Sequence, residues 1–245
     1  MSQQYPKLML PKGYLSWSQM QIWMNNRDRY IREYFEDAKR LDTRYLRFGS
    51  AFSKMVENLC EIMNRIPNRM LAIEELRKEY PMDDNMVSVL MELDIEGISE
   101  FQIGNSGKQG DPCSVVKVRG IVPVLAFFDK YIRRTNALRE YKTGLAPWTM
   151  AKVIKHDQLP YYGVCLKWAG LPLPPYADLD WIETKEVEEE RQDFWRDGAK
   201  VILATGKIKS FHREFDEREF ERMEELIIRV AWEISDAYQD HLAQL

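Results

Sequence analysis

Cysteine is scarce in this chain: its 245 residues include only Cys60, Cys113 and Cys165. The three are odd in number, lie far apart and form no C-x-x-C pair. A disulfide framework, a zinc site and an iron–sulfur cluster are therefore not expected. A reducing, cytoplasmic compartment fits this cysteine usage best.

Positive charge is not in excess, because 35 Lys and Arg residues stand against 39 Asp and Glu residues, which gives a net charge of −4. A general basic coat for nucleic acid is thus excluded, and any DNA contact must come from local basic patches. Such a patch is either a solvated helix face or the wall of a DNA channel. One candidate lies in the N-terminal part and comprises Arg27, Arg29, Arg32, Lys39, Arg40, Arg44 and Arg47.

The chain also lacks a long apolar run. No window holds eighteen apolar residues, so no membrane-spanning helix and no membrane partner are expected. The opening MSQQYPKLML has no basic region and too short an apolar run for a signal peptide. The phosphate-binding pattern G-x-x-x-x-G-K-[ST] and the dinucleotide pattern G-x-G-x-x-G are both absent.

The residues that are abundant can build a core. Hydrophobic residues make up 45 % of the chain, and seven Trp, twelve Tyr and ten Phe favour a packed globule over disorder. The order of predicted elements is helices, hairpin, helix, strands and helix, which indicates an α/β class. We expect one domain over residues 1–245, with a helical part at about 15–95 and an α/β core at about 100–245.

The helical part has readable boundaries. Ser16 and Gln19 form a capping-box pattern that predicts a helix from Ser16 to about Ala38. Gly49 is expected to open a second helix that ends before Pro67. Residues 70–93 are predicted to be helical with an interruption at Pro81.

The α/β part begins after a loop that runs from Gly104 to Pro112. Asp129 is expected to end a strand and begin a hairpin connection. The stretch 148–168 is predicted to be helical, either kinked at Pro160 or beginning near Asp157. Predicted strands cover 114–118, 121–128, 136–141, 178–184 and 200–209. The acidic run 186–190 is expected to be a solvated loop or helix face. A last helix is predicted after the capping pair Asp216 and Glu219, with a hydrophobic staple formed by Phe215 and Phe220.

Chemistry is indicated by Glu140 and Lys142, which share one face of a predicted strand because alternate strand residues point the same way. Taken alone, they are compatible with a simple ion pair. If a twist or bulge brings Asp129 beside Glu140, two carboxylates repel, and a divalent cation with oxygen ligands, Mg²⁺ or Mn²⁺, relieves that repulsion. Lys142 can then orient or deprotonate an attacking water.

Four segments in order resemble the PD-(D/E)xK nuclease superfamily, and more particularly its RecB-like and phage exonuclease branch. LSWSQMQIWMNNRDRYIREY is similar to the opening helix of those proteins, and FGSAFSKMVENL to the following helix, which begins at a Gly. REYKTG with an upstream Asp resembles the D…(D/E)xK signature, and QLPYY the "Q-x-x-x-Y" helix. The resemblance implies a restriction-endonuclease-like core, with a mixed central sheet flanked by helices.

The same resemblance implies site residues. Asp129, Glu140 and Lys142 match the catalytic positions, and the Tyr141 carbonyl is an additional metal ligand. Many relatives carry the Asp in "G-x-x-D", which allows two alignments. One places Ala126 and Asp129 at these positions, whereas the other places Gly120 and Pro123 there and would make the chain inactive.

Relatives carry a His or Glu ligand in the helix that begins at a Gly. The His position falls near Ser53, so that Glu57, one turn later, is the expected third ligand; otherwise it is a solvated Glu. Cysteines that hold an iron–sulfur cluster in some relatives are absent, because their first-helix position reads Asn25-Asn26-Arg27. The expected cofactor is therefore Mg²⁺ or Mn²⁺, without a cluster.

Other residues complete the expected DNA site. Gln158 and Tyr162, one helical turn apart, are expected to bind a phosphate or the catalytic Lys, or else to be a buried amide and a core Tyr. Arg133 and Arg134 in the hairpin turn are candidates for a phosphate clamp. His156 is expected to be a surface or capping residue, or else to touch DNA.

These features predict a divalent-metal-dependent DNA nuclease, an exonuclease in preference to a restriction-type enzyme, since no recognition domain is visible. The alternative is a catalytically silent nuclease fold that binds DNA or a protein partner. The resemblance also suggests a phage or mobile-element origin.

Overall fold

The computed structural model of the protein describes residues 7–40, 42–105, 113–188 and 200–245. Its helices are α1 (Trp17–Asn25), α2 (Arg27–Tyr30), the π-helix η1 (Ile31–Phe35), α3 (Arg44–Met63), α4 (Arg69–Leu76), α5 (Asp84–Glu92), α6 (Met150–Ile154), α7 (Gln158–Trp168) and α8 (Glu217–Ala243). Its strands are β1 (Ile98–Ile103), β2 (Val116–Val118), β3 (Val122–Val124), β4 (Ala126–Ile132), β5 (Ala137–Gly144), β6 (Tyr176–Glu188) and β7 (Lys200–Glu214).

Five strands form the central sheet in the order β1-β4-β5-β6-β7, and β2 pairs with β3 in a separate ribbon. β5 and β6 run parallel, whereas the other neighbours in the large sheet run antiparallel. A parallel pair needs a crossover connection, and α6 and α7 lie in the one between β5 and β6. The predicted mixed sheet flanked by helices is confirmed, and β5 is its middle strand.

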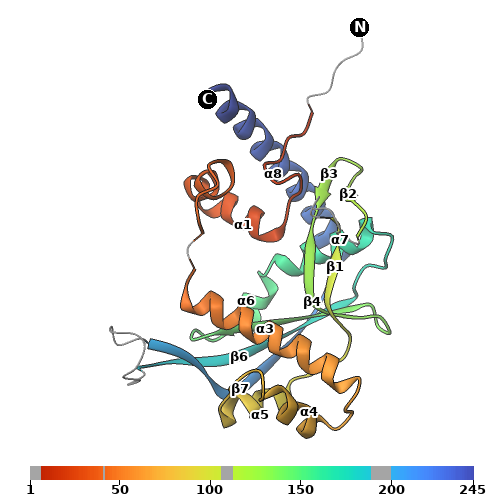
Figure 1. The fold of residues 1–245 in the computed structure, drawn as a ribbon. Coiled ribbons are helices and arrows are strands. Elements are labelled where there is room, and N and C mark those ends of the chain that lie inside the picture. The colour runs from red at the N-terminus through yellow and green to blue at the C-terminus, as the bar shows by residue number, and fades with distance from the viewer. Residues whose placement is uncertain (1–6, 41, 106–112, 189–199) are drawn as a thin grey trace.

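Helices cover both faces of this sheet (Figure 1). α3 crosses one face, where its Phe52 belongs to the same buried cluster as Tyr141 of β5 and Ile182 of β6. α7, α8 and α1 enclose a second buried cluster that includes Leu138 of β5 and Met223 of α8. Side chains of β5 therefore alternate between two different helical layers. No helix in the described ranges is both long and apolar enough to cross a membrane.

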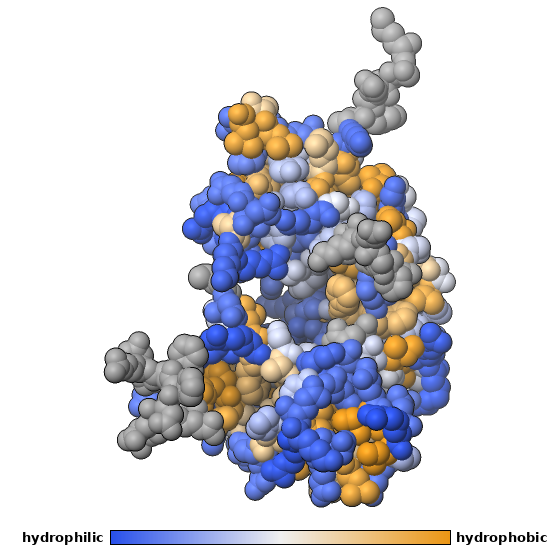
Figure 2. Space-filling view, in the orientation of Figure 1, coloured by the Kyte–Doolittle hydropathy of each residue, from blue (hydrophilic) through white to orange (hydrophobic). Residues whose placement is uncertain are grey.

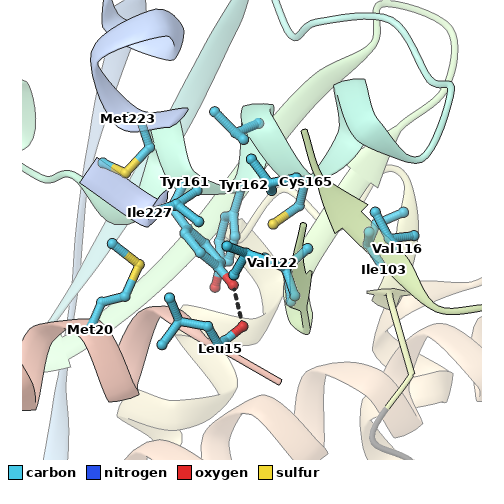
Figure 3. Close-up of a cluster of buried hydrophobic side chains, with 14 of the residues drawn as sticks. Leu15, Met20, Ile103, Val116, Val122, Tyr161, Tyr162, Cys165, Met223 and Ile227 are labelled. Atoms are coloured by element: carbon cyan, nitrogen blue, oxygen red, sulfur yellow. Dashed lines mark hydrogen bonds between the residues drawn. The ribbon is translucent and has the colours of Figure 1, made fainter. Parts of the chain in front are cut away.

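Tyr161 of α7 holds the second cluster together (Figure 3). Its side chain is fully buried, and its hydroxyl donates hydrogen bonds to the carbonyls of Leu15 at 2.9 Å and Leu125 at 3.2 Å. These bonds tie the segment before α1 and the β3–β4 junction to α7. Because α7 also carries Gln158 and Tyr162, this packing fixes the part of the site that α7 contributes.

The N-terminal helix is shorter than the sequence predicts. Ser16 caps α1, but Gln19 does not complete a capping box, because its side-chain oxygen accepts a hydrogen bond from the Tyr30 hydroxyl. The helix ends at Asn25, and Asn26 then caps a new helix by accepting a hydrogen bond from the Arg29 amide. The continuous helix to Ala38 is therefore wrong, because an Asn side chain offers the backbone a competing cap.

The second helix begins earlier than predicted. Thr43 caps α3 by accepting a hydrogen bond from the Leu46 amide, so that Gly49 lies inside the helix. A Cβ added at Gly49 would meet Thr143 Oγ1 at 3.5 Å, which places this part of α3 beside the end of β5. The predicted interruption near Pro81 is confirmed, because α4 ends at Leu76 and α5 begins at Asp84.

Several strands also differ from their predicted bounds. The predicted strand 121–128 is two strands, β3 and β4, and Asp129 lies inside β4 and not at its end. β1 was not predicted at all. β6 continues through the first part of the acidic run, so residues 186–188 are in a strand and not in a loop or helix. Residues 106–112 of the predicted loop and residues 189–190 of the acidic run lie outside the described residues.

The helix ends in the α/β part follow the sequence. α7 begins after Asp157 with Pro160 in its first turn, which confirms the second of the two predicted starts. Asp216 and Glu219 form a capping box at α8. The rings of Phe215 and Phe220 lie 5.2 Å apart, as a hydrophobic staple requires.

Candidate active site

β5 presents charged side chains to both helical layers. Arg139 and Tyr141 face the layer of α3, whereas Glu140 and Lys142 face α7. β5 is paired on both sides, with β4 and with β6. The backbone of this strand is therefore held rigidly, and the direction of its side chains is set by the pleat.

Glu140 and Lys142 form a close ion pair on the α7 side. Lys142 Nζ lies 2.6 Å from Glu140 Oε1, and the Glu140 side chain is only 5 % exposed. The other oxygen, Glu140 Oε2, is buried and has no hydrogen-bond partner among the described residues. A buried carboxylate oxygen without a partner is costly, so this atom is the strongest sign of a ligand position in the site.

α7 completes a chain of polar contacts. Lys142 Nζ donates a hydrogen bond of 2.9 Å to Gln158 Oε1, and Gln158 Nε2 donates to the Tyr162 hydroxyl. Burial raises the pKa of Tyr162 well above its ordinary value, and the nearby carboxylates of Glu140 and Asp129 raise it further. The phenol therefore stays protonated at neutral pH. The structure brings together the four residues that the Glu-x-Lys and Gln-x-x-x-Tyr patterns contribute.

Asp129 lies where β4 and β5 separate. The ladder between these strands is formed by Lys130–Ile132 with Ala137–Arg139, and beyond it Asp129 Oδ2 accepts a hydrogen bond of 2.7 Å from the Tyr141 amide. Pro123 is in β3 and pairs with Lys117 in the separate ribbon. The structure thus places Asp129, and not Pro123, beside the Glu-x-Lys strand, which favours the first of the two alignments.

Lys130 anchors the strand next to Asp129. Its side chain is fully buried, and Nζ donates hydrogen bonds to Cys60 Sγ at 2.8 Å and to Ser99 Oγ. These contacts tie β4 to α3 and to β1. Sequence reasoning did not identify this lysine, because it placed residue 130 in the hairpin connection and not in a strand.

Glu57 is close to Asp129 but forms an ion pair with Lys54. Both residues line a narrow crevice between α3 and the strands, together with Ser53 and Tyr141. Glu57 Oε2 lies 2.6 Å from Lys54 Nζ in an exposed ion pair. Within the described ranges, no three His, Cys, Asp or Glu side chains are grouped so as to hold a metal ion. Glu57 as third ligand and the Tyr141 carbonyl as a further one stay predictions.

Arg133 and Arg134 occupy the turn between β4 and β5, as predicted. Arg134 is 75 % exposed and lies 3.4 Å from Glu96. Because Arg133 is four residues beyond Asp129, it is about 13 Å further along the strand direction. These arginines are therefore not directly beside Asp129, and a clamp formed by them would contact a different phosphate.

The basic patch of the N-terminal part is largely paired with carboxylates. Arg29 lies 2.6 Å from Glu33, and Arg44 lies 3.0 Å from Glu186. Exposed pairs of this kind contribute little energy, and the DNA channel wall stays a prediction. Arg27, Arg40 and Arg47 are also paired, with Glu233, Glu33 and Asp42.

A cleft of about 480 Å³ adjoins Lys142 and was not predicted. Residues of α1, β4, the loop before α6 and α7 line it, and Figure 2 shows this face of the molecule hollowed between the parts that carry α1 and α3. His156 is one of the lining residues. Burial lowers its pKa to about 3, and the positive charges of Lys142 and Arg213 contribute, so its imidazole is neutral at neutral pH.

The arrangement can act on a phosphodiester. It offers a fixed ammonium, a carboxylate with an oxygen that has no partner, a second carboxylate nearby and a neutral phenol. Negative charge that develops on a phosphate is stabilised by such fixed positive groups and hydrogen-bond donors.

No family model and no curated protein matches the chain. Among solved structures, it is similar to a phage-related exonuclease from Haemophilus somnus 129PT, with a TM-score of 0.44, 9 % identity, and coverage of 89 % of this chain and 81 % of that one. A provisionally assigned exonuclease from Eubacterium rectale gives a TM-score of 0.49, 12 % identity, and coverage of 96 % and 87 %. At these scores, the likeness assigns no activity or site residue to this chain.

Proposed function

We propose that this protein is a divalent-metal-dependent DNA nuclease that hydrolyses phosphodiester bonds from DNA ends. The observation that carries the proposal is the buried Glu140 carboxylate, whose Oε1 holds Lys142 while Oε2 has no partner among the described residues. A buried carboxylate oxygen without a partner is costly, and a bound cation would remove that cost.

The residues present fit a hard cation. Mg²⁺ is typically held by one or two carboxylates, with its remaining positions on water and substrate phosphates. Asp129 and Glu140 would supply the two carboxylates, and Glu57 would join them after release from Lys54. When bound, the cation supplies Lewis-acid stabilisation of charge on the phosphate.

Each polar residue then has a task. Lys142, fixed by Glu140 and Gln158, orients the attacking water and stabilises charge on the phosphoryl oxygens. The water oxygen bonds to phosphorus, the ester P–O bond breaks, and the leaving oxygen takes up, net, the proton that the water loses. Tyr162 is a positioning residue, because its hydroxyl holds the Gln158 side chain that contacts Lys142.

The test is digestion of end-labelled linear DNA and of closed circular DNA. We expect mononucleotide or short products from linear DNA with Mg²⁺ or Mn²⁺, little attack on the circle, and no cutting in excess EDTA. Lys78→Ala is a matched control, because Lys78 is 72 % exposed and paired with Glu75 on α4. Full activity in EDTA would overturn the metal mechanism. DNA binding without cutting under all of these conditions would favour the catalytically silent alternative.

A further inference from the structure

The cleft beside Lys142 joins aromatic rings to the proposed point of cutting. Trp17 of α1, Phe127 of β4 and Trp148, which precedes α6, all line it. Phe127 is 48 % exposed, although it is a large apolar side chain on the central sheet. Lys142 lines the same cleft, so that any group held by these rings lies next to the proposed site of hydrolysis.

The polar part of the lining is uncharged apart from Lys142. No Asp or Glu is among the described residues that line the cleft. Among the described residues His156 Nε2 is buried without a hydrogen-bond partner, and the ring of His156 lies edge-on to that of Trp148 at 5.0 Å. The cleft thus combines ring faces, a hydrogen-bonding atom without a partner and one positive charge.

These properties match a nucleotide whose base is unpaired. In a duplex the faces of each base are covered by neighbouring bases, whereas an unpaired base can stack on aromatic side chains and offer its edge for hydrogen bonding. A volume of about 480 Å³ is also in the range of pockets that hold one small ligand.

We propose that this cleft is a stacking subsite for an unpaired base next to the phosphate that is cut, and that the protein therefore acts on single-stranded or frayed ends in preference to intact duplex. The proposal rests on the proposed nuclease function for the position of the phosphate, whereas the stacking itself does not require cutting. Phe127 is its main stacking residue, and His156 contacts the base edge. Trp148 adds a second ring, one face of which already has Lys152 Nζ at 4.3 Å from the ring centroid.

The test measures binding of the full chain without metal. The probes are a fluorescein-labelled oligo(dT), an oligomer of the same length built from abasic sugar phosphates, and a blunt duplex. The oligo(dT) and the abasic oligomer carry the same charge, so their difference reports the bases alone. We expect oligo(dT) to bind about 5- to 100-fold more tightly than the abasic oligomer, the range that base stacking on aromatic residues provides.

The variants locate the effect. Phe127→Ala should remove most of the difference between oligo(dT) and the abasic oligomer. Ile121→Ala is the matched control, because Ile121 is 45 % exposed but lies in the β2–β3 turn, and it should change that difference by less than about twofold. Trp148→Phe keeps an aromatic ring and should retain most of the affinity, whereas Trp148→Leu should lose it. Melting curves establish that each variant is folded.

The outcomes separate this inference from the proposed function. Equal binding of oligo(dT) and the abasic oligomer, tighter binding of the duplex, or an unchanged Phe127→Ala variant would each overturn the stacking subsite. If the chain cuts DNA under any of those outcomes, the nuclease function stands and the subsite fails. If the chain cuts no DNA but binds bases through Phe127, the subsite stands as a binding site and the nuclease function fails.

Discussion

The charged side chains on the two faces of β5 differ in how many partners they have. On the α3 side, both terminal nitrogens of Arg139 are engaged, with Asp94 at 2.7 Å, Asp178 at 3.1 Å and Asp180 at 2.9 Å. Ser210 also donates a hydrogen bond to Asp180. On the α7 side, the Lys142 ammonium contacts one carboxylate and one amide, and Glu140 Oε2 has no hydrogen-bond partner in the part of the chain that the structure describes.

This difference distinguishes the Arg139 network from the Glu140–Lys142 pair. Several carboxylates around Arg139 hold β5 to β6, and within the described ranges its Nε is buried without a hydrogen-bond partner. Fewer partners around Lys142 leave Glu140 Oε2 as an oxygen that a cation could bind. Because the two networks alternate along one strand, the Arg139 network can keep the other face fixed in position.

The largest expected effect is on the α7 side. Lys142→Ala and Glu140→Gln should each lower the single-turnover cleavage rate by about 10²- to 10⁴-fold, the range for loss of a positioned catalytic group. The two variants should differ in metal affinity, because Glu140 is a proposed ligand and Lys142 is not. Mn²⁺ titration should therefore show weaker binding for Glu140→Gln only. Folded variants that cut at near the wild-type rate would remove this face of β5 from the mechanism.

Arg139→Ala should instead act on stability. Removing one partner of a buried ionic network leaves uncompensated charge and costs about 3–5 kcal/mol. Asp180 is almost fully buried, so its carboxylate cannot be rehydrated without moving the strand. Urea unfolding measures the loss, and single-turnover cleavage by the folded fraction should change much less than in Lys142→Ala. A large rate loss without a stability loss would mean that the two faces are not functionally distinct.

A smaller loss of stability is expected as the pH decreases, and it should come from His156 on the α7 side. The folded-state pKa of His156 is lowered to about 3 from 6.5, chiefly by burial. The unfolded chain therefore binds a proton that the folded chain excludes, so the stability is complete above pH 6.5 and falls as the pH decreases from 6.5 toward 3. Between pH 7 and pH 5 the loss should be about 2 kcal/mol.

Urea unfolding at pH 7 and pH 5 measures this loss of stability in the wild type and in His156→Gln. The variant should show no such loss. His212→Gln is the matched control, because His212 lies 2.8 Å from Asp178 on the Arg139 side and leaves His156 in place. His212→Gln should lose as much stability between pH 7 and pH 5 as the wild type does. An equal loss in wild type and His156→Gln would contradict the assignment.

The smallest effect is expected for Tyr162→Phe. The variant removes one hydroxyl from the contact with Gln158, and a single hydrogen bond contributes about 1 kcal/mol. Cleavage should fall by about tenfold or less, because Gln158 still reaches Lys142. Melting temperature and cleavage rate, measured together with those of Gln158→Ala, show whether the contact acts through Lys142. A loss as large as that of Lys142→Ala would make Tyr162 more than a positioning residue.

Much of the fold could be predicted from local signals. Capping at Ser16 and Asp216, the break near Pro81 and the start of α7 after Asp157 depend on neighbouring residues only, and the structure confirms them. The predictions failed where tertiary contacts compete with local preference. Gln19 contacts Tyr30 and not its own helix end. β1 has little strand pattern of its own and exists because it pairs with β4.

Some residues of the candidate site could be predicted from the sequence alone: Glu140 and Lys142 at alternate positions, and Gln158 and Tyr162 one helical turn apart. Periodicity alone places such pairs on common faces. Three features of the site appear in the folded chain alone: Asp129 and not Pro123 lies beside β5, Lys130 is buried against Cys60, and aromatic rings from distant segments line one cleft. These facts depend on strand pairing and on the packing of α1, α3 and α7, which bring together residues that no local pattern connects.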